Sequence, residues 1–279
     1  MALGTILVCL TTQEHAATLM KLAAGLARKH MAHLIGLHTL EALLVYPGIA
    51  MHVPEPAFAE FNASQRAEAE AIERIFDRYT RNEDFPSEWR LLKAESVSAT
   101  DRMIESARTA DLVIMAHEDP DADRFDQRRA QAAVIRESGR PVIVVPRDYD
   151  GPPVGANILL GWSNTRETAR AAHDLIPLAD PGASVTVLRI TDGVSDEMRY
   201  YEALDLAAMF DRHGLKPALQ HRERGGDDIA ALLGQFAFET GADLIVTGAF
   251  GHSRAFDFVL GATSYALLRD AKLPVLFSR

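Results

Sequence analysis

Short runs of apolar residues alternate along the chain with longer stretches in which apolar residues recur at helical spacing. The apolar runs are rich in β-branched residues, which is typical of strands buried on both faces. Strands that alternate with helix-length amphipathic segments build parallel α/β sheets. In the second half we therefore expect four helices between strands at about 158–161, 185–190, 218–221, 244–248 and 275–277.

The two halves of the chain repeat each other in sequence. Residues 110–115 read Ala-Asp-Leu-Val-Ile-Met, residues 242–247 read Ala-Asp-Leu-Ile-Val-Thr, and a Pro-Val run closes each half. A repeat of this length is far longer than a solenoid unit and indicates two tandem domains. We predict domains at 1–147 and 156–279, joined by a turn-rich linker at 148–155.

The first helix of each half is preceded by a similar signal. Thr11 with Glu14, and Asn164 with Glu167, have the three-residue spacing of a capping box. The halves differ in the second crossover, where the first half inserts a loop at 45–56 before a long helix. This loop is either a lid or a surface excursion, and loop statistics favour the second.

Composition and charge narrow the class of protein. The chain has 279 residues, 48% of them hydrophobic, and a formal charge of −10. This is the composition of a globular protein, and its acidity disfavours binding to nucleic acid or to anionic membranes. The single cysteine, Cys9, forms no internal disulfide, and we find neither a secretory signal nor a membrane-spanning run. We therefore expect a cytoplasmic protein with a small ligand or a protein partner.

The fourth strand of the second half leads into a glycine-containing loop. Gly248 and Gly251 allow the backbone to approach a phosphate, and Gly261 opens a helix whose free N–H groups favour an anion. Ligands of open α/β sheets bind beyond the carboxyl ends of the strands. The alternative is that these glycines only form turns. The polar residues that could assist an anion are His252, Ser253, Arg254, Thr263 and Ser264.

This spacing resembles a known family. Gly248, Gly251 and Gly261, followed by a helix and a terminal Pro-Val-Leu strand, resemble the universal stress protein family in its tandem, two-domain form. The resemblance implies two Rossmann-like domains of the adenine nucleotide alpha hydrolase type, with helices on both faces of each sheet. Each sheet is expected to hold five parallel strands in the order 3-2-1-4-5. The last strands of the two halves are expected to pair with each other.

The resemblance also implies a ligand. In the members that bind ATP, the glycine loop holds the phosphates, a hydroxyl follows the third glycine, and an aspartate ends the first strand. Here Ala262 stands at the hydroxyl position with Thr263 next to it, and Gly161 or Trp162 stands at the aspartate position with Ser163 beside it. Trp162 either stacks on a base or belongs to the core, and an aromatic residue there is more often core. These departures weaken the nucleotide interpretation without removing it.

The corresponding loop of the first half is acidic. Residues 116–129 contain five carboxylates and no glycine, which disfavours a triphosphate. Asp119, Asp121 and Asp123 alternate as in a calcium loop, but Arg124 replaces the required glycine. We expect a solvated acidic loop without a metal.

Two hypotheses follow. The first is a stress-response protein that binds ATP, or AMP or ADP with magnesium, in its second domain with little or no turnover, because the loop has no evident general base or nucleophile. The second is a nucleotide-free scaffold or dimerisation module that acts through protein partners. A homodimer is compatible with both.

Overall fold

The computed structural model describes the chain except for residues 1, 42–54, 95–96, 118–126, 192–196 and 252–260. In the first half the elements are β1 (Thr5–Cys9), α1 (Gln13–His30), β2 (His33–Glu41), α3 (Glu55–Thr80), β3 (Ser87–Ala94), α4 (Ala99–Ala107), β4 (Leu112–Ala116), α5 (Gln127–Glu137) and β5 (Val142–Val145). In the second half they are β6 (Asn157–Gly161), α6 (Arg166–Asp174), β7 (Ser184–Thr191), α7 (Glu197–Arg212), β8 (Lys216–Glu223), α8 (Ile229–Thr240), β9 (Leu244–Gly248), α9 (Ala262–Asp270) and β10 (Val275–Ser278).

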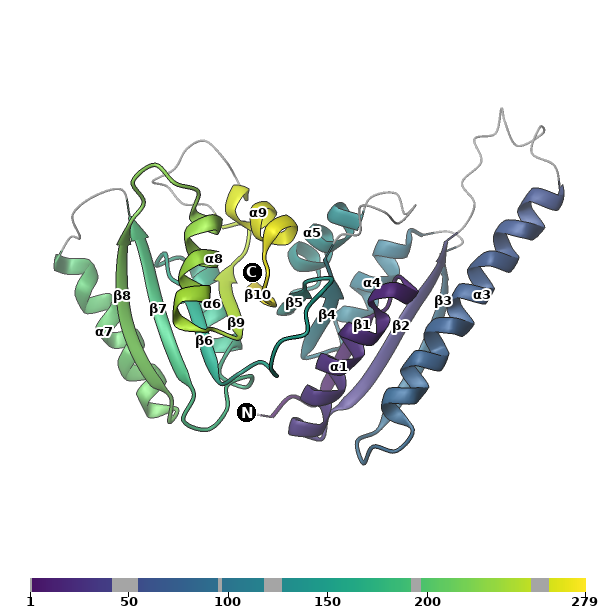
Figure 1. The fold of residues 1–279 in the computed structure, drawn as a ribbon, viewed down its shortest axis with the longest axis horizontal. Coiled ribbons are helices and arrows are strands. Elements are labelled where there is room, and N and C mark those ends of the chain that lie inside the picture. Colours follow the sequence, from purple (N-terminus) through teal and green to yellow (C-terminus); the bar gives the residue numbers. More distant parts are fainter. Residues whose placement is uncertain (1, 42–54, 95–96, 118–126, 192–196, 252–260) are drawn as a thin grey trace.

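All these strands belong to one sheet, in the order β3-β2-β1-β4-β5-β10-β9-β6-β7-β8. Within each half the five strands are parallel and follow the order 3-2-1-4-5, as expected. The halves join at the centre of the molecule, where β5 and β10 pair antiparallel with Val144 opposite Val275 and Val142 opposite Phe277 (Figure 1). The predicted α/β fold and the predicted pairing of the halves are therefore confirmed.

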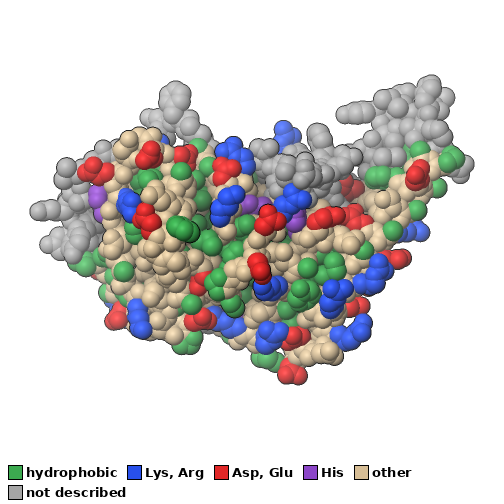
Figure 2. All heavy atoms as spheres, in the orientation of Figure 1, with side chains coloured by type: hydrophobic (Ala, Val, Ile, Leu, Met, Phe, Trp, Pro, Cys, Tyr) green, Lys and Arg blue, Asp and Glu red, His purple; other side chains and the backbone are tan. Residues whose placement is uncertain are grey.

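The surface carries charges of both signs. On the face drawn in Figure 2, basic and acidic side chains are interspersed over both halves. That face offers no continuous basic patch of the kind that neutralises a nucleic-acid backbone. None of the helices among the described residues combines the length and apolar character that crossing a membrane requires.

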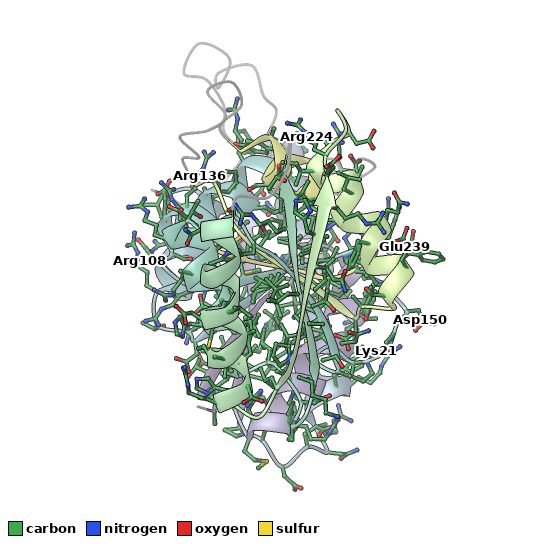
Figure 3. The ribbon with its side chains drawn as sticks, turned by 90° about the vertical axis from the view of Figure 1, so that its left-hand side faces the viewer. Lys21, Arg108, Arg136, Asp150, Arg224 and Glu239 are labelled. Carbon is green, nitrogen blue, oxygen red and sulfur yellow. The ribbon has the colours of Figure 1, made fainter. Side chains whose placement is uncertain are left out.

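Polar contacts from α1 support the junction between the halves. The Lys29 ammonium donates to the Leu178 carbonyl and pairs with Asp180, both at 2.6 Å. Lys21 pairs with Asp150 at 2.6 Å, and the two lie side by side in Figure 3. Exposed ion pairs stabilise a fold by about 0–1 kcal/mol each. The junction therefore rests mainly on the sheet and on the apolar core.

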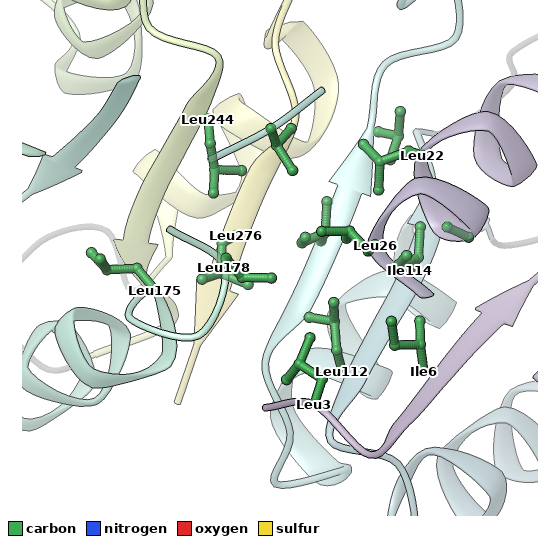
Figure 4. Close-up of a cluster of buried hydrophobic side chains, with 14 of the residues drawn as sticks. Leu3, Ile6, Leu22, Leu26, Leu112, Ile114, Leu175, Leu178, Leu244 and Leu276 are labelled. Carbon is green, nitrogen blue, oxygen red and sulfur yellow. The ribbon is translucent and has the colours of Figure 1, made fainter. Parts of the chain in front are cut away.

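Two apolar layers cover the sheet. Alternate residues of a strand point to opposite faces. Ile6 therefore belongs to the layer that includes residues of α1, α3, α6 and α7, and Leu7 belongs to the layer that includes residues of α4, α5, α8 and α9. The first layer runs across the junction without interruption. Leu26 of α1 and Leu178 after α6 belong to the same cluster as Leu276 of β10 (Figure 4).

The repeated Ala-Asp-Leu sequence has a structural role in each half. Asp243 accepts hydrogen bonds from the backbone N–H groups of Gly155, Ala156 and Asn157, each at 2.8 Å. Asp111 accepts equivalent bonds from two N–H groups at the start of β1. Each aspartate thus ties the start of its half's first strand to the neighbouring fourth strand.

The predicted capping boxes are wrong in both halves. The residue before α1 is Thr12, which makes no side-chain cap and instead bonds its hydroxyl to His15 Nδ1 at 3.2 Å. The box of α6 is formed by Thr165 and Thr168, because Asn164 adopts a positive φ of 49° and stays outside the helix. Glu167 is therefore free of the capping role. The loop predicted at 45–56 lies almost entirely outside the described residues.

Replacing Phe277 with alanine tests the junction. The Phe277 side chain is fully buried at the junction strand, so truncation removes apolar contacts from the centre of the sheet. We expect the free energy of unfolding to fall by roughly 3 to 5 kcal/mol, measured by chemical denaturation. Phe238→Ala is the matched control, because Phe238 is 88% exposed. Its effect is expected within about 0.5 kcal/mol, and equal losses in both variants would contradict the prediction.

Candidate functional site

The candidate site lies where β6 and β9 end. These strands are neighbours, with Gly161 opposite Thr247, and β6 has β7 on its other side. In an α/β sheet this is the switch point, where chain connections leave in opposite directions and open a crevice for a ligand. We define the glycine loop as residues 248–251 and 261–264, the described parts of the segment between β9 and the first turn of α9.

Two of its glycines allow close packing against α6. A Cβ atom on Gly248 would lie 2.6 Å from the backbone nitrogen of Thr168 and 2.8 Å from Cβ of Glu167. A Cβ atom on Gly251 would lie 2.7 Å from Oε2 of Glu167. At Gly248 the nearest neighbours are backbone atoms that cannot move aside, so this glycine has a packing reason independent of any ligand. At Gly251 the neighbour is the end of a flexible side chain, which can shift, so packing alone does not require a glycine there.

Gly261 forms the N-cap of α9. Its φ of 87° is in the left-handed region, and a Cβ atom there would lie 2.8 Å from the Phe250 ring. As a glycine it supplies no side-chain acceptor, so no side chain caps the helix at this position. Ala262 and Thr263 follow in the first turn and are partly exposed. Among the described residues, no side chain caps the amino end of α9, whose positive dipole favours an anion.

An arginine of the first half holds the loop. The Phe250 N–H donates to Ser264 Oγ at 3.2 Å, and the Phe250 ring meets the Tyr265 ring edge-on at 5.3 Å between centroids. The guanidinium carbon of Arg136, on α5, lies 4.0 Å from the centre of the Phe250 ring. Arg136 also donates to the Tyr265 hydroxyl at 3.2 Å. The first half therefore places a positive charge on the loop of the second.

A buried carboxylate lies against the same loop. Glu167, in the first turn of α6, has a side chain only 5% exposed, and it accepts a bond from Arg166 Nε at 2.5 Å. Burial acts to raise its pKa, but bonds from Arg166, from its own backbone N–H and from Thr165 outweigh this, so the pKa is lowered from its usual value. Glu167 is ionised at neutral pH.

The remaining predicted residues divide into three groups. Trp162 follows β6, is partly buried and packs against the core, which favours the core interpretation over base stacking. Ser163 is exposed beside it. His252, Ser253 and Arg254 lie outside the described residues, and their roles stay predictions. Sequence reasoning missed Glu167 and Arg136 as site residues, because both reach the loop from elements distant in the chain.

The end of β4, which corresponds to the glycine loop in the first half, has different contacts. Ala116 stands where Gly248 stands in the second half, and its carbonyl accepts a bond at 2.5 Å from Nε2 of Gln131, a buried residue of α5. Most of the acidic loop, 118–126, lies outside the described residues. Among the residues that the structure does describe, no group of three or more His, Cys, Asp or Glu side chains is arranged to hold a metal ion.

Fold and site together define a tandem α/β protein with one glycine loop at a sheet switch point. Comparison with family models identifies the family: the universal stress protein family model matches residues 3–146 and again residues 156–279. The chain therefore belongs to the universal stress protein family, in a two-domain form. The linker bounds at 148–155 stay a prediction. A search of curated proteins gave no match.

Solved structures show the same architecture over the whole chain. A universal stress protein from Archaeoglobus fulgidus is similar with a TM-score of 0.71 and 12% identity, covering 98% of this chain and 96% of that one. A putative universal stress protein from Pseudomonas aeruginosa has a TM-score of 0.61 and 16% identity, covering 99% and 93%. A protein of unknown function from the same organism has a TM-score of 0.57 and 16% identity, covering 99% and 92%. At these identities the likeness concerns the fold.

Replacing Arg136 with alanine tests the contact between the halves. Loss of a cation over an aromatic ring at an exposed position costs about 0.5 to 1 kcal/mol. We expect a loss of that size in unfolding free energy, and a coupling of similar size between Arg136→Ala and Phe250→Leu in a double-mutant cycle. Arg108→Ala, an exposed arginine of the same half, is the control (Figure 3). Strictly additive effects would contradict the contact.

His117, the residue after β4, predicts a pH dependence of stability. It is 7% exposed, and its pKa is lowered to about 4, chiefly by burial and further by the charges of Lys272 and His15, while Asp270 acts to raise it. Between pH 6.5 and about 4 the unfolded chain binds a proton here and the folded chain does not, so stability falls as the pH drops through this window.

One pKa unit corresponds to about 1.4 kcal/mol, so the lowered pKa of His117 accounts for a loss of at most about 3 kcal/mol in the free energy of unfolding. Between pH 7 and pH 4.5 the free energy of unfolding is expected to fall for both proteins, but by about 2 kcal/mol less for His117→Gln than for the unmodified protein. Urea denaturation at each pH measures this difference. All other titrating groups are common to the two proteins and cancel in the difference. Parallel pH profiles would rule out His117 as the cause.

Proposed function

We propose that the second half of this protein binds an adenine nucleotide, ATP or AMP or ADP with magnesium, and that the protein acts in stress response. The observation that carries the proposal is the amino end of α9, which has no side-chain cap and follows a glycine loop at the switch point beside β6. An uncapped helix end at this place suits the phosphate of a nucleotide. Arg136 adds a positive charge beside the loop.

Little or no turnover is part of the proposal. The described loop residues are Gly, Ala, Phe, Thr and Ser, which supply backbone amides and hydroxyls but no general base. A hydroxyl held in a hydrogen bond, as Ser264 is by Phe250, serves to position the loop. We therefore infer a binding module in which the bound nucleotide alters the loop and the partners that contact it.

A nucleotide-free scaffold is the second candidate. The specific observation that favours it is the buried carboxylate of Glu167 against Gly251, which disfavours a phosphate in the same place. In that case the glycines serve packing alone, and the two halves serve to present protein-binding surfaces. A homodimer belongs to either proposal.

A cytoplasmic location is the third part of the proposal. Cys9 is buried, and burial raises the pKa of its thiol to about 12, so the thiol is unreactive. A lone, inert cysteine fits a reducing compartment. The mixed charges on the face in Figure 2 and the acidic net charge fit a small ligand or a protein partner better than nucleic acid or a membrane.

Calorimetric titration with ATP and with AMP, with and without magnesium, tests the proposal. Gly251→Glu places a second carboxylate in the glycine loop, and we expect it to weaken binding at least tenfold, or by about 1.4 kcal/mol. Gly234→Glu is the matched control, since it adds the same side chain to an exposed position of α8 with no atom within 4 Å of the new Cβ. No heat with either nucleotide at high micromolar protein would favour the scaffold instead.

A further inference from the structure

Glu167 supplies no group that would favour a phosphate, yet it lies against two glycines of the loop. Its Oε2 is 2.7 Å, its Cδ 3.1 Å and its Cγ 3.4 Å from the position that a Cβ on Gly251 would occupy. The whole carboxylate therefore lies along the second glycine of the loop. The Cβ of Glu167 lies just as close to the place of a Cβ on Gly248. One acidic side chain thus borders both of the glycines nearest to β9.

The described residues balance the charge of this carboxylate only in part. Its ion-pair partner among the described residues is Arg166, whose side chain is 81% exposed and therefore largely hydrated. The Thr165 hydroxyl and the backbone N–H of Glu167 also donate toward it, which keeps it ionised although it is buried. Charges interact more strongly in a buried site than in water, because solvent screens them less.

We propose that Glu167 determines specificity at the glycine loop, excluding polyphosphates so that the site takes an adenine ligand with one phosphate or none. The inference rests on the proposed function, because it concerns the same site. A single phosphate at the amino end of α9 keeps the favourable dipole of the helix. Each further phosphate adds negative charge beside a loop that already has a fixed carboxylate, so affinity decreases from AMP to ADP to ATP.

Titration of the unmodified protein and of Glu167→Gln with adenosine, AMP, ADP and ATP, in EDTA so that no magnesium neutralises the added phosphates, tests the inference. Glutamine keeps the size of the side chain and removes its charge. We expect the variant to bind ATP about tenfold more tightly, equal to about 1.4 kcal/mol, and AMP less than about threefold more tightly. In the unmodified protein we expect affinity to decrease from AMP to ADP to ATP. In the variant we expect the three affinities to be similar or their order to be reversed.

Asp174→Asn is the matched control. Asp174 is the last residue of the same helix, where it pairs with Arg170, so its replacement removes one negative charge far from the loop. We expect no change in ATP affinity. Glu167→Asp is the second variant. Its side chain is shorter by one methylene group, so the charge lies farther from the loop, and we expect a gain in ATP affinity between those of the unmodified protein and Glu167→Gln. Thermal unfolding of each variant establishes that it is folded.

The possible outcomes separate the inference from the proposed function. If both proteins bind ATP equally, the inference is overturned while nucleotide binding stands. If Glu167→Gln binds ATP more weakly, the inference is also overturned, because the carboxylate then supports the ligand instead of repelling it. If no adenine compound binds either protein, the proposed function fails and the inference fails with it.

Discussion

The antiparallel pairing of β5 with β10 is the constraint on which the rest of the structure depends. Each half alone would leave the last strand of a parallel sheet as an open, apolar edge, which is a site for aggregation. Paired with each other, all residues of both strands are buried. The same pairing gives the two halves a common core on one face and sets α5 beside α9 on the other, where Arg136 reaches Phe250.

Within this common frame the two halves differ in the loop that follows their fourth strand. Both keep an aspartate that ties their first strand to their fourth, Asp111 in one and Asp243 in the other. After the fourth strand, the second half uses glycine and a serine hydroxyl, whereas the first uses Ala116 held by Gln131. The pairing involves β5 and β10 and not these loops, so a change after the fourth strand of one half leaves the pairing unaffected.

The sequence was sufficient for the strands, the helices and the two domains, because their spacing and the repeat are patterns along the chain. The strand order and the pairing of the two last strands were predicted from the resemblance to the family instead. The sequence located Gly248, Gly251 and Gly261 because their spacing is also a pattern along the chain. It failed at the capping boxes, where the positive φ of Asn164 moves the start of α6 by one residue. It also missed Glu167 and Arg136 as site residues, since their contacts with the loop join elements far apart in the chain. Such contacts depend on side-chain packing, which periodicity does not describe.

The charges around the loop explain why those two residues matter. The amino ends of α6 and α9 both lie at this edge of the sheet, and each has a positive dipole end. In α6 that end is already compensated by the Thr165 cap and by Glu167. In α9 it has no side-chain cap, and Arg136 of the other half lies near it. Within the part of the chain that the structure describes, the charges beside the loop are those of one helix end and one exposed arginine, opposed by one buried carboxylate. This balance suits a ligand of low negative charge.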